Sequence, residues 1–241
     1  MTRALNDFEV VSFDCFGTLI DWETGIAAAL APWLARHSLA RSRDAVLARF
    51  AAHETDIESR DPELRYPRVL ENVLRRMAAD WRVDCTDAEA REFGASVVSW
   101  PPFPDTAAAL TYLQRHYRLA ALSNVDVQSA STTVKKLGIE FELVITAEEV
   151  GSYKPDLRNF EYLLASLAKR GVQAGGVLHT AQSLFHDVAP AKRLNLATNW
   201  IDRRANAPGW GATPPPRQPV VPDFRHESLA EFVAHHRTLL G

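Results

Sequence analysis

The sequence predicts an α/β protein built on a parallel sheet, with an all-helical segment inserted near its N-terminus. Short β-rich runs stop at polar residues, helical patterns separate most of these runs, and residues 22–100 show helical patterns alone. Strands that alternate with helices are typical of βαβ units, which place their strands parallel in one sheet. Ligands of such sheets bind beyond the carboxyl ends of the strands, so the residues that follow each strand are the first candidates for a site.

The α/β part is expected to contain five strands and five helices. The β-rich runs cover residues 9–13, 118–122, 141–145, 176–179 and 196–200. The helical patterns cover residues 105–117, 126–137, 157–170, 186–194 and 228–240. Residues 204–222 hold six of the chain's 14 prolines, and we expect a surface connection there rather than a lid or an oligomer arm.

The inserted segment is expected to hold helices over residues 22–40, 42–58, 63–81 and 86–98. Thr86 and Glu89 match a capping box, and Asp44 can cap or charge a first turn. The run Trp100-Pro-Pro-Phe-Pro104 cannot continue a helix. We therefore expect residues 1–20 and 102–241 to form the α/β core, residues 21–101 to form a helical cap, and the proline run to be one hinge.

Composition excludes several classes of protein. Of the 241 residues, 46% are hydrophobic and 24% charged, which is ordinary for a globular protein, and the net charge of −3 offers no basic field for nucleic acid or an anionic membrane. The N-terminus lacks the apolar segment of a signal peptide, and the longest strongly apolar stretch is too short to span a bilayer. Two cysteines make neither a disulfide framework nor a zinc site. We expect a cytoplasmic protein without nucleic-acid or membrane partners.

Four groups of polar residues follow strands or open the next helix. They are Asp14-Cys-Phe-Gly-Thr-Leu19, Ser123-Asn124, Lys154-Pro155-Asp156 and Gln182-Ser-Leu-Phe-His-Asp187. Because the carboxyl ends of parallel strands share one edge of a sheet, we expect these groups to converge there. The edge would then carry two carboxylates, an ammonium, and hydroxyl and amide groups.

These motifs, in this order and with helices inserted between the first two, resemble the haloacid dehalogenase (HAD) superfamily across essentially the whole chain. The resemblance implies a Rossmann-like sheet with a mobile cap. It also implies that Asp14 is the nucleophile, that Thr18 and Ser123 position the reacting group, that Lys154 supports Asp14, and that Asp187 is the acid of the fourth motif.

The residues themselves suit these roles. A carboxylate acts in covalent catalysis only when it is ionised and fixed, and a nearby ammonium such as Lys154 favours the ionised form of Asp14. Thr18, Ser123 and Asn124 offer donors for a bound anion. Each also has a structural interpretation, because Thr18 can cap a turn and Lys154 can pair with a structural carboxylate.

Two departures from the family pattern indicate the reaction. Family phosphatases place a proton-donating aspartate two residues after the nucleophile, where this chain has Phe16, and their fourth motif commonly begins with an acid where this chain has Gln182. A magnesium site would have only the carboxylates of Asp14 and Asp187. Leaving groups that need no general acid, such as halide, fit better, and the aromatic residue at position 16 is similar to the type II L-2-haloacid dehalogenases, which use no metal.

The expected function is therefore a metal-independent, cofactor-free hydrolase of a small 2-substituted carboxylic acid, with 2-haloacid dehalogenation as the leading activity. Asp14 would attack C2 to form an ester, and water directed by Asp187 and Lys154 would hydrolyse it. A magnesium-dependent phosphatase or phosphonatase is an alternative. The resemblance to the type II enzymes also implies a homodimer.

The expected substrate contacts are Phe16, Trp22, His53, Glu54, Tyr66, Asn124, Gln182 and Ser183. The haloacid enzymes carry an arginine on the first cap helices, but residues 50–55 contain none, so His53 or Glu54 is expected to replace it, or else Arg65 and Arg68 reach in. Cap glutamate suits a substrate that carries an amine.

Residues 179–187 and 209–213 resemble a subgroup that includes azetidine-2-carboxylate hydrolase, which makes ring opening of L-azetidine-2-carboxylate a further alternative. Cys15, His179 and His186 are expected to have packing or supporting roles.

Overall fold

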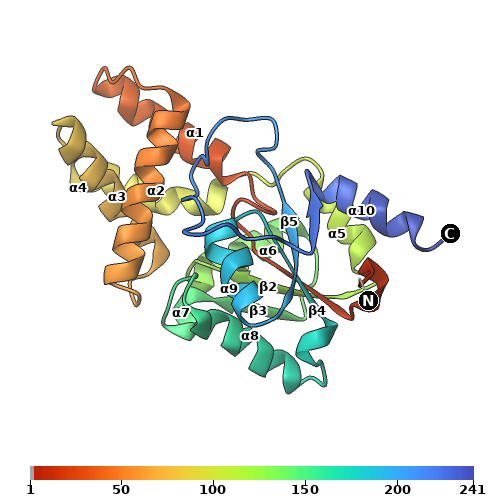
Figure 1. Cartoon of the computed structure of the whole chain (residues 1–241). Helices are drawn as coiled ribbons and strands as arrows, with labels where there is room; N and C mark the ends of the chain where they lie inside the picture. The colour runs from red at the N-terminus through yellow and green to blue at the C-terminus, as the bar shows by residue number, and fades with distance from the viewer. Residues whose placement is uncertain (1–2) are drawn as a thin grey trace.

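A six-stranded, entirely parallel sheet organises the structure, a computed structural model that describes residues 3–241 (Figure 1). The strands are β1 Val10–Phe13, β2 Arg118–Ser123, β3 Leu143–Thr146, β4 Val177–Ala181, β5 Ala197–Ile201 and β6 Phe224–His226. Their order across the sheet is β3-β2-β1-β4-β5-β6. The chain thus builds one side of the sheet outward from β1 and then crosses to place β4 on the other side of β1. The crevice beyond the carboxyl ends of β1 and β4 is the place where ligands bind in such sheets.

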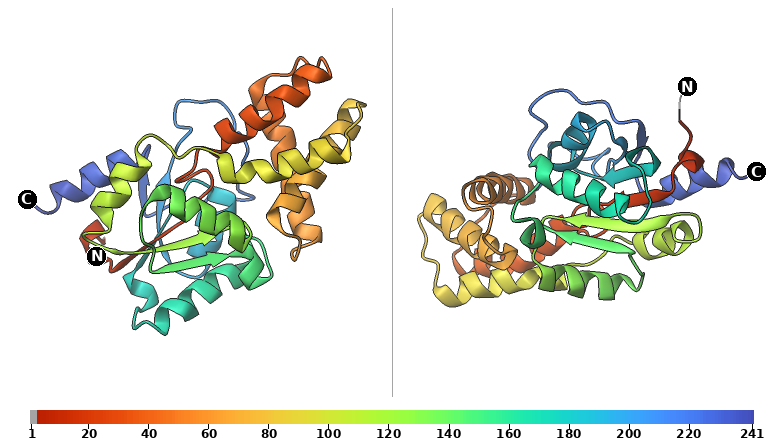
Figure 2. Two further views of the ribbon diagram at one scale, coloured as in Figure 1. Left: turned by 180° about the vertical axis from the view of Figure 1, so that it is seen from behind. Right: turned by 90° about the horizontal axis from the view of Figure 1, so that it is seen from below.

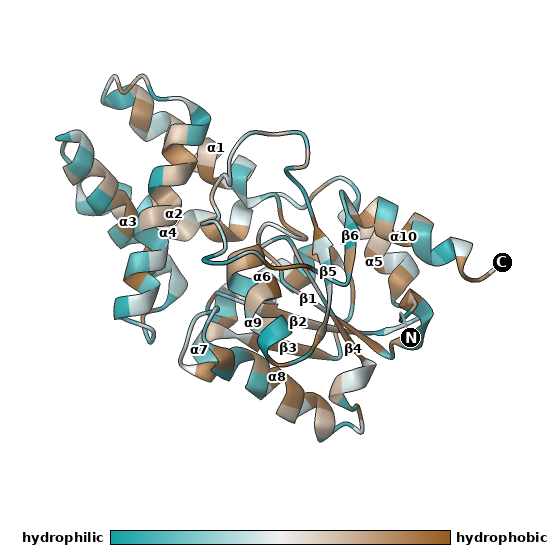
Figure 3. Ribbon diagram, in the orientation of Figure 1, coloured by the Kyte–Doolittle hydropathy of each residue, from teal (hydrophilic) through white to brown (hydrophobic). Residues whose placement is uncertain are grey.

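Alternating side chains along each strand separate two hydrophobic layers. The helices that cover the sheet are α5 Thr106–Leu113, α6 Val127–Leu137, α7 Ala147–Val150, α8 Leu157–Ala168, α9 Ala189–Arg193 and α10 Leu229–Thr238. Val10 of β1 packs in a cluster with α8 and α9, whereas Val11 belongs to the cluster that contains α5, α6 and α10. Because both faces are covered, all four residues of β1 are buried. Figure 3 shows the strands as largely hydrophobic and the outer sides of the helices as hydrophilic.

The predicted α/β class with its helical cap is confirmed, and all five predicted strands are present within two or three residues of their expected ends. β6 was not predicted, because its three residues follow the proline-rich segment and carry no β-rich pattern. The helix expected from residue 186 begins instead at Ala189, and the residues before it form a π-helical turn, η4 Leu184–Val188.

Four helices and a short 3-10 turn stand away from the sheet at the end where its strands terminate, as Figures 1 and 2 show. They are α1 Trp22–Arg36, α2 Arg43–Arg60, α3 Tyr66–Trp81, α4 Asp87–Ala95 and η2 Ser96–Ser99. The capping box of Thr86 and Glu89 is confirmed at the start of α4. At the start of α2, Ser42 is the cap, and Asp44 lies in the first turn beside it. We call residues 22–99 the cap helices.

The two connections between the cap helices and the sheet run side by side. Ile20 forms a β-bridge with Pro102, and the backbone N–H of Asp21 donates to the carbonyl of Pro101 at 2.8 Å. Gly25 lies so close to the Trp100 ring that a Cβ atom there would overlap it. The proline run is therefore paired with the chain segment that leaves the nucleophile motif.

The proline-rich segment 204–222 contains no helix or strand and is fastened to the first cap helix. Arg204 Nη1 forms an ion pair with Glu23 Oε2 at 2.5 Å, and the backbone N–H of Ala212 donates to Glu23 Oε1 at 3.0 Å. The segment thus connects β5 with β6 and also holds α1. Across residues 3–241, the helices lack the combination of length and apolar character needed to cross a membrane.

Candidate active site

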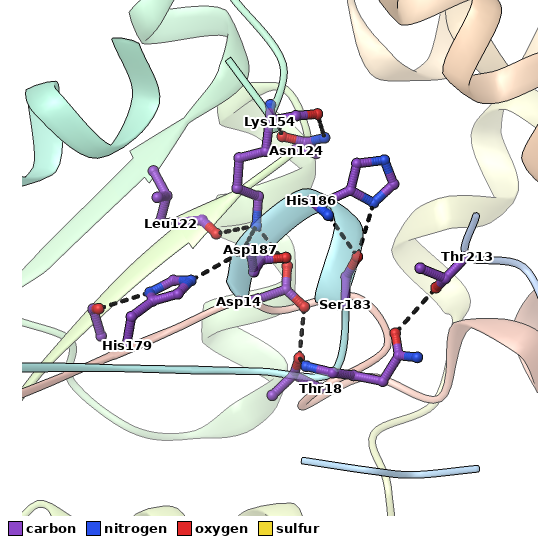
Figure 4. Close-up of polar contacts among 12 residues, drawn as sticks. Asp14, Thr18, Leu122, Asn124, Lys154, His179, Ser183, His186, Asp187 and Thr213 are labelled. Carbon is purple, nitrogen blue, oxygen red and sulfur yellow. Dashed lines mark hydrogen bonds and ion pairs between the residues drawn. The ribbon is translucent and has the colours of Figure 1, made fainter. Parts of the chain in front are cut away.

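The four sequence motifs meet beyond the carboxyl ends of β1, β2 and β4. Asp14 directly follows β1, Ser123 ends β2, Lys154 lies between α7 and α8, and Asp187 lies in η4. Figure 4 shows the side chains of Asp14, Lys154 and Asp187 converging from these separate elements. The crossover next to β1 therefore produces the convergence that the motif positions predicted.

Lys154 is the centre of this cluster. Its Nζ donates to Asp14 Oδ1 at 2.9 Å, to Asp187 Oδ1 at 2.7 Å and to the Leu122 carbonyl at 2.9 Å, which uses all three protons of the ammonium. Only 2% of the residue is exposed. Burial alone would lower the pKa of Lys154, but the two carboxylates outweigh it and hold the pKa above its ordinary value. Lys154 is thus a fixed cation.

Asp14 is fixed through both of its carboxyl oxygens. Oδ1 faces Lys154, and Oδ2 accepts from the Thr18 hydroxyl at 2.6 Å. Thr18 Oγ1 in turn accepts from the backbone N–H of Gln182 at 2.9 Å, which ties the nucleophile motif to the loop after β4. Burial raises the pKa of Asp14, and the Lys154 ammonium opposes that rise. The result is a buried, oriented carboxylate at the end of the central strand.

Asp187 is held by a second buried chain of polar groups. Its Oδ1 lies 3.0 Å from His179 Nε2, and His179 Nδ1 lies 2.9 Å from Ser12 Oγ. Burial alone would raise the pKa of Asp187, but Lys154 and His179 outweigh it and lower the pKa below its ordinary value. Asp187 therefore stays ionised and is a weak proton acceptor.

A narrow cavity lies between this cluster and the cap helices. Its lining residues are Asp14, Phe16, Trp22, Glu54, Glu58, Tyr66, Asn124, Val125, Lys154, Gln182, Ser183, His186, Asp187 and Thr213. The free space is about 30 Å³, room for about two water molecules. Core residues form one wall, and α1, α2 and α3 form the other. The nucleophile thus faces the cap across a narrow space.

Aromatic rings close one side of the cavity. The Phe16 ring lies 6.4 Å from Tyr66 and 5.8 Å from Trp100, measured between centroids. Trp22, which begins α1, lies 6.0 Å from the Phe50 ring. These rings exclude bulk water from the space in front of Asp14, which strengthens the electrostatic interactions within it.

The cap wall opposite carries two carboxyl groups, from Glu54 and Glu58. They lie four residues apart on α2 and therefore share a helix face. The Tyr66 hydroxyl donates to Glu54 Oε1 at 2.6 Å, and Asn124 Nδ2 lies 3.5 Å from Glu58 Oε2. Burial raises the pKa of Glu54 to about 8. Burial and the neighbouring Glu54 raise the pKa of Glu58 well above its usual range.

Most of the residues expected at the site lie around this cavity. Asp14, Phe16, Trp22, Glu54, Tyr66, Asn124, Lys154, Gln182, Ser183 and Asp187 line it. Thr18 lies behind Asp14 as its hydrogen-bond donor, and Ser123 is buried beside the cluster with its hydroxyl unpartnered among the described residues.

His53 does not reach the cavity. Its Nε2 lies 2.6 Å from Asp80 Oδ2, on another side of α2. The two arginines considered for the same role are also elsewhere, since Arg65 pairs with Glu148 and Arg68 with Glu71. Of His53 and Glu54, only Glu54 therefore lines the cavity that contains Asp14. An acid thus stands where the family resemblance implies an arginine.

Four cavity residues were not among the expected substrate contacts: Glu58, Val125, His186 and Thr213. Glu58 could have been found from its spacing of four residues after Glu54. Thr213, whose hydroxyl lies 3.1 Å from Gln182 Oε1, is brought in by the irregular proline-rich segment, which has no periodic signal.

His186 was expected to play a supporting role, yet its ring lies at the cavity. Burial lowers its pKa to about 4, so the imidazole is neutral. Cys15, beside the nucleophile in sequence, is buried, and burial raises the pKa of its thiol to about 12. Cys15 is therefore a protonated packing residue.

The donor set does not fit a divalent cation well. Within residues 3–241 no cluster of three or more His, Cys, Asp or Glu side chains has the arrangement of a metal site. Asp14 and Asp187 both direct an oxygen to the Lys154 ammonium, and Phe16 and Gln182 add no carboxylate. Mg²⁺ prefers several oxygen ligands in octahedral geometry, which these residues do not supply.

The family model of haloacid dehalogenase-like hydrolases matches residues 8–180, which include three of the four motifs and the cap helices. The chain belongs to the haloacid dehalogenase-like hydrolases. A comparison with curated proteins finds no match to this hydrolase.

Solved structures of L-2-haloacid dehalogenases are similar to this hydrolase along their whole length. A defluorinating L-2-haloacid dehalogenase has a TM-score of 0.77 and 25% identity, with 98% of each chain covered. Another L-2-haloacid dehalogenase has a TM-score of 0.75 and 22% identity, with 96% of this chain and 99% of the other covered. The enzyme from Xanthobacter autotrophicus with chloropropionic acid covalently bound has a TM-score of 0.75 and 17% identity, covering 95% and 98%. These similarities place the core and the cap in a common fold.

Proposed function

We propose that this hydrolase replaces the 2-substituent of a small carboxylic acid by a hydroxyl group, through an ester on Asp14 and without a metal. The observation that carries the proposal is the Asp14 carboxylate, fixed between Lys154 and Thr18 at the wall of a narrow cavity with aromatic sides. Phe16 stands where a phosphatase of the family would need an acid. The reaction of first choice is 2-haloacid dehalogenation, the activity named for the similar structure at 25% identity.

In the first step an oxygen of Asp14 attacks C2 and displaces the substituent. Lys154 keeps the attacking carboxylate oriented through Oδ1, and Thr18 does so through Oδ2. The aromatic side of the cavity excludes water, so that the carboxylate is not shielded by hydration. Orientation and partial desolvation are what a weak carboxylate nucleophile requires.

In the second step water attacks the acyl carbon of the Asp14 ester and releases the 2-hydroxy acid. Asp187 orients this water, and the Lys154 ammonium stabilises the negative charge that develops on the carbonyl oxygen. The side-chain amide of Asn124 donates to the Lys154 carbonyl at 3.1 Å and accepts from the Lys154 backbone N–H at 2.7 Å, which keeps the lysine loop in register with β2.

A second candidate is hydrolytic ring opening of L-azetidine-2-carboxylate. The specific observation in its favour is the cap wall, which presents Glu54 and Glu58 where a halide-binding cation would be expected. Of the cavity-lining side chains, Lys154 is the only lysine or arginine, and it is already bonded to Asp14 and Asp187. An amine suits two carboxyl groups better than a halide ion does, because opposite charges attract and like charges repel.

A magnesium-dependent phosphatase or phosphonatase is the third candidate, and Phe16 argues against it. A screen of phosphate esters and phosphonates with magnesium or with a chelator separates it from the others. Magnesium-dependent release of phosphate would support the phosphatase or phosphonatase and would contradict the proposed ester of a carboxylic acid on Asp14.

The mechanism is tested by single-turnover reaction in oxygen-18 water with L-2-chloropropionate and L-azetidine-2-carboxylate. Mass spectrometry of the Asp14 peptide is expected to show first a substrate adduct and then one labelled oxygen. D14N is expected to abolish turnover, whereas D84N, at an exposed aspartate of the cap, is the matched control and retains it. Label in the product hydroxyl with none in Asp14 would contradict an ester intermediate.

We further propose that residues 21–101 open and close over the core as one cap, because about 30 Å³ of free space cannot admit the substrate. Limited proteolysis of the 101–104 connection, with and without substrate, tests this. The homodimer and the cytoplasmic location stay predictions, the first to be checked by sedimentation and the second by cell fractionation.

A further inference from the structure

The absence of an acid beside the nucleophile does not leave the site without one. Phe16 occupies the position from which a family phosphatase protonates its leaving group, but α2 of the cap brings Glu54 and Glu58 to the opposite side of the cavity. Both residues are nearly inaccessible, with 2% and 5% of their surfaces exposed. A buried carboxyl group without a cationic partner holds its proton.

The surroundings of this pair decide its charge. Tyr66 and Tyr153 face it from α3 and from the loop before Lys154, and burial together with the two glutamates raises the pKa of both tyrosines. His186 is neutral, and Lys154, the cation that lines the same cavity, is bonded to Asp14 and Asp187; Arg158 and Arg217 line a neighbouring pocket that Glu58 also reaches. Within residues 3–241 neither glutamate forms an ion pair, and burial outweighs the attraction of Lys154 for Glu58, so at neutral pH the two glutamates share at least one proton.

A second observation shows that the cavity is shaped for a polar guest. His186 lines it, is 93% buried, and has a ring nitrogen, Nε2, without a hydrogen-bond partner in residues 3–241. Figure 4 shows that the other nitrogen, Nδ1, faces Ser183 and that Nε2 points away from it. A buried polar atom without a partner is costly, and a ligand with a polar group would satisfy it.

We propose that Glu54 and Glu58 act as a proton-sharing pair that protonates and holds the leaving nitrogen of a 2-amino-substituted carboxylic acid. The inference rests on the proposed ester mechanism and names its substrate class. Tyr66 is a positioning residue that orients Glu54 through its hydroxyl.

In such a substrate a secondary amine is attached to C2. The pair gives one proton to the amine, which becomes an ammonium opposite the resulting carboxylate. Asp14 forms a bond to C2, the C2–N bond breaks, and its electron pair stays on nitrogen to give a neutral amine. Water then cleaves the Asp14 ester, and the proton released returns to the glutamate pair. The net reaction adds one water across the C2–N bond.

A halide would not use this wall. It leaves as a stable anion without a proton, and two carboxyl groups repel it when either is ionised. An amine cannot leave as an anion, so protonation is required before the C2–N bond breaks. Strain in a four-membered ring further favours the cleavage.

The test compares two substrates in E54Q, E58Q and a matched control, E71Q. Glu71 is also a buried cap glutamate, but it pairs with Arg68 and does not line the cavity. The ratio of L-azetidine-2-carboxylate opening to Asp14 ester formation from L-2-chloropropionate is expected to fall about 100-fold in E54Q and E58Q, the usual contribution of a general acid, and to stay unchanged in E71Q.

A spectroscopic measurement keeps the test independent of turnover. Infrared difference spectra between neutral and alkaline pH are expected to show loss of a buried carboxylic acid band in the wild type and in E71Q, and no such band in the double variant E54Q/E58Q. Y66F removes a donor that favours ionised Glu54, so the alkaline limb of the ring-opening rate is expected to move to higher pH.

The outcomes separate the inference from the function on which it rests. If the wild type forms no ester on Asp14 with either substrate, the proposed function fails and the inference fails with it. If the ester forms from the haloacid but the azetidine ring stays closed, or if the glutamine variants slow both substrates equally, the inference alone is overturned. Absence of the buried acid band in the wild type also overturns it.

Discussion

Replacing Lys154 by methionine is expected to lower both stability and nucleophilic reactivity, because it leaves two carboxylates facing each other in a buried site. The ammonium lies 2.9 Å from Asp14 Oδ1 and 2.7 Å from Asp187 Oδ1. At an effective dielectric constant of about 20, each contact is worth roughly 6 kcal/mol of attraction. The cost of desolvating three charges offsets most of this sum, so that breaking a buried ion pair typically costs about 3–5 kcal/mol.

That loss is large beside the stability of roughly 5–15 kcal/mol that a folded protein has. For a chain of this size it corresponds to a fall in Tm of about 6–20 °C. Urea denaturation of K154M measures it, with K169M, at the exposed lysine that follows the last residue of α8, as the control. The double variant D14N/K154M is expected to recover part of the loss, because it removes one of the two unpaired carboxylates.

The same variants test the chemistry. Without the ammonium, burial and Asp187 both raise the pKa of Asp14, so ester formation in K154M is expected to be slower and to recover as pH rises. A K154M protein with wild-type urea midpoint and wild-type ester formation would refute the reasoning that the ammonium holds the two carboxylates ionised.

Three further changes have expected outcomes. H179F removes the imidazole beside Asp187. The lowered pKa of the Asp187 carboxyl stabilises the folded protein at pH above the pKa of the unfolded chain, and this stability is lost as pH falls through the pKa of the folded state. The midpoint of acid unfolding, measured by circular dichroism, is therefore expected to move to higher pH in H179F. G25A places a methyl group in the Trp100 ring and is expected to destabilise by about 1–3 kcal/mol in urea, an outcome that a fully stable variant would exclude. E23Q weakens the contact between α1 and the proline-rich segment, and faster proteolysis of that segment is expected.

The core of the site could be predicted from sequence because its residues are tied to strand ends. Asp14, Ser123 and Asp187 follow β-rich runs, and parallel strands bring such positions to one edge. Lys154 belongs to the loop before α8, yet its motif spacing was enough to place it at the same edge. The strength of the hydrophobic pattern in these strands explains why the fold class was predicted correctly.

The cap wall was harder to predict. His53 and Glu54 are neighbours on one helix, and only the packing of α2 against α3 decides that Glu54 turns to Tyr66 while His53 turns to Asp80. Successive residues of a helix are rotated by about 100°, so the two side chains point in different directions. The sequence of α2 alone does not determine which of these directions faces the cavity, because that depends on the helix against which α2 packs. Thr213 could not be predicted for another reason, since irregular backbone carries no periodic pattern.

The division of the cavity between two parts of the chain would link the proposed cap movement to the binding of protons. Glu54 and Glu58 belong to the cap and owe their raised pKa chiefly to burial against the core. The proposed opening would hydrate them and return the pKa of Glu54 from about 8 toward 4.5, so that opening would release protons to solvent and closing would take them up.

Closure is therefore favoured most at pH below the ordinary carboxyl pKa and loses this contribution as pH rises through about 8. Substrate affinity measured by calorimetry in buffers of different ionisation enthalpy would count the protons. In the proposed cap movement, pH would therefore shift the equilibrium between the open and the closed cap over Asp14.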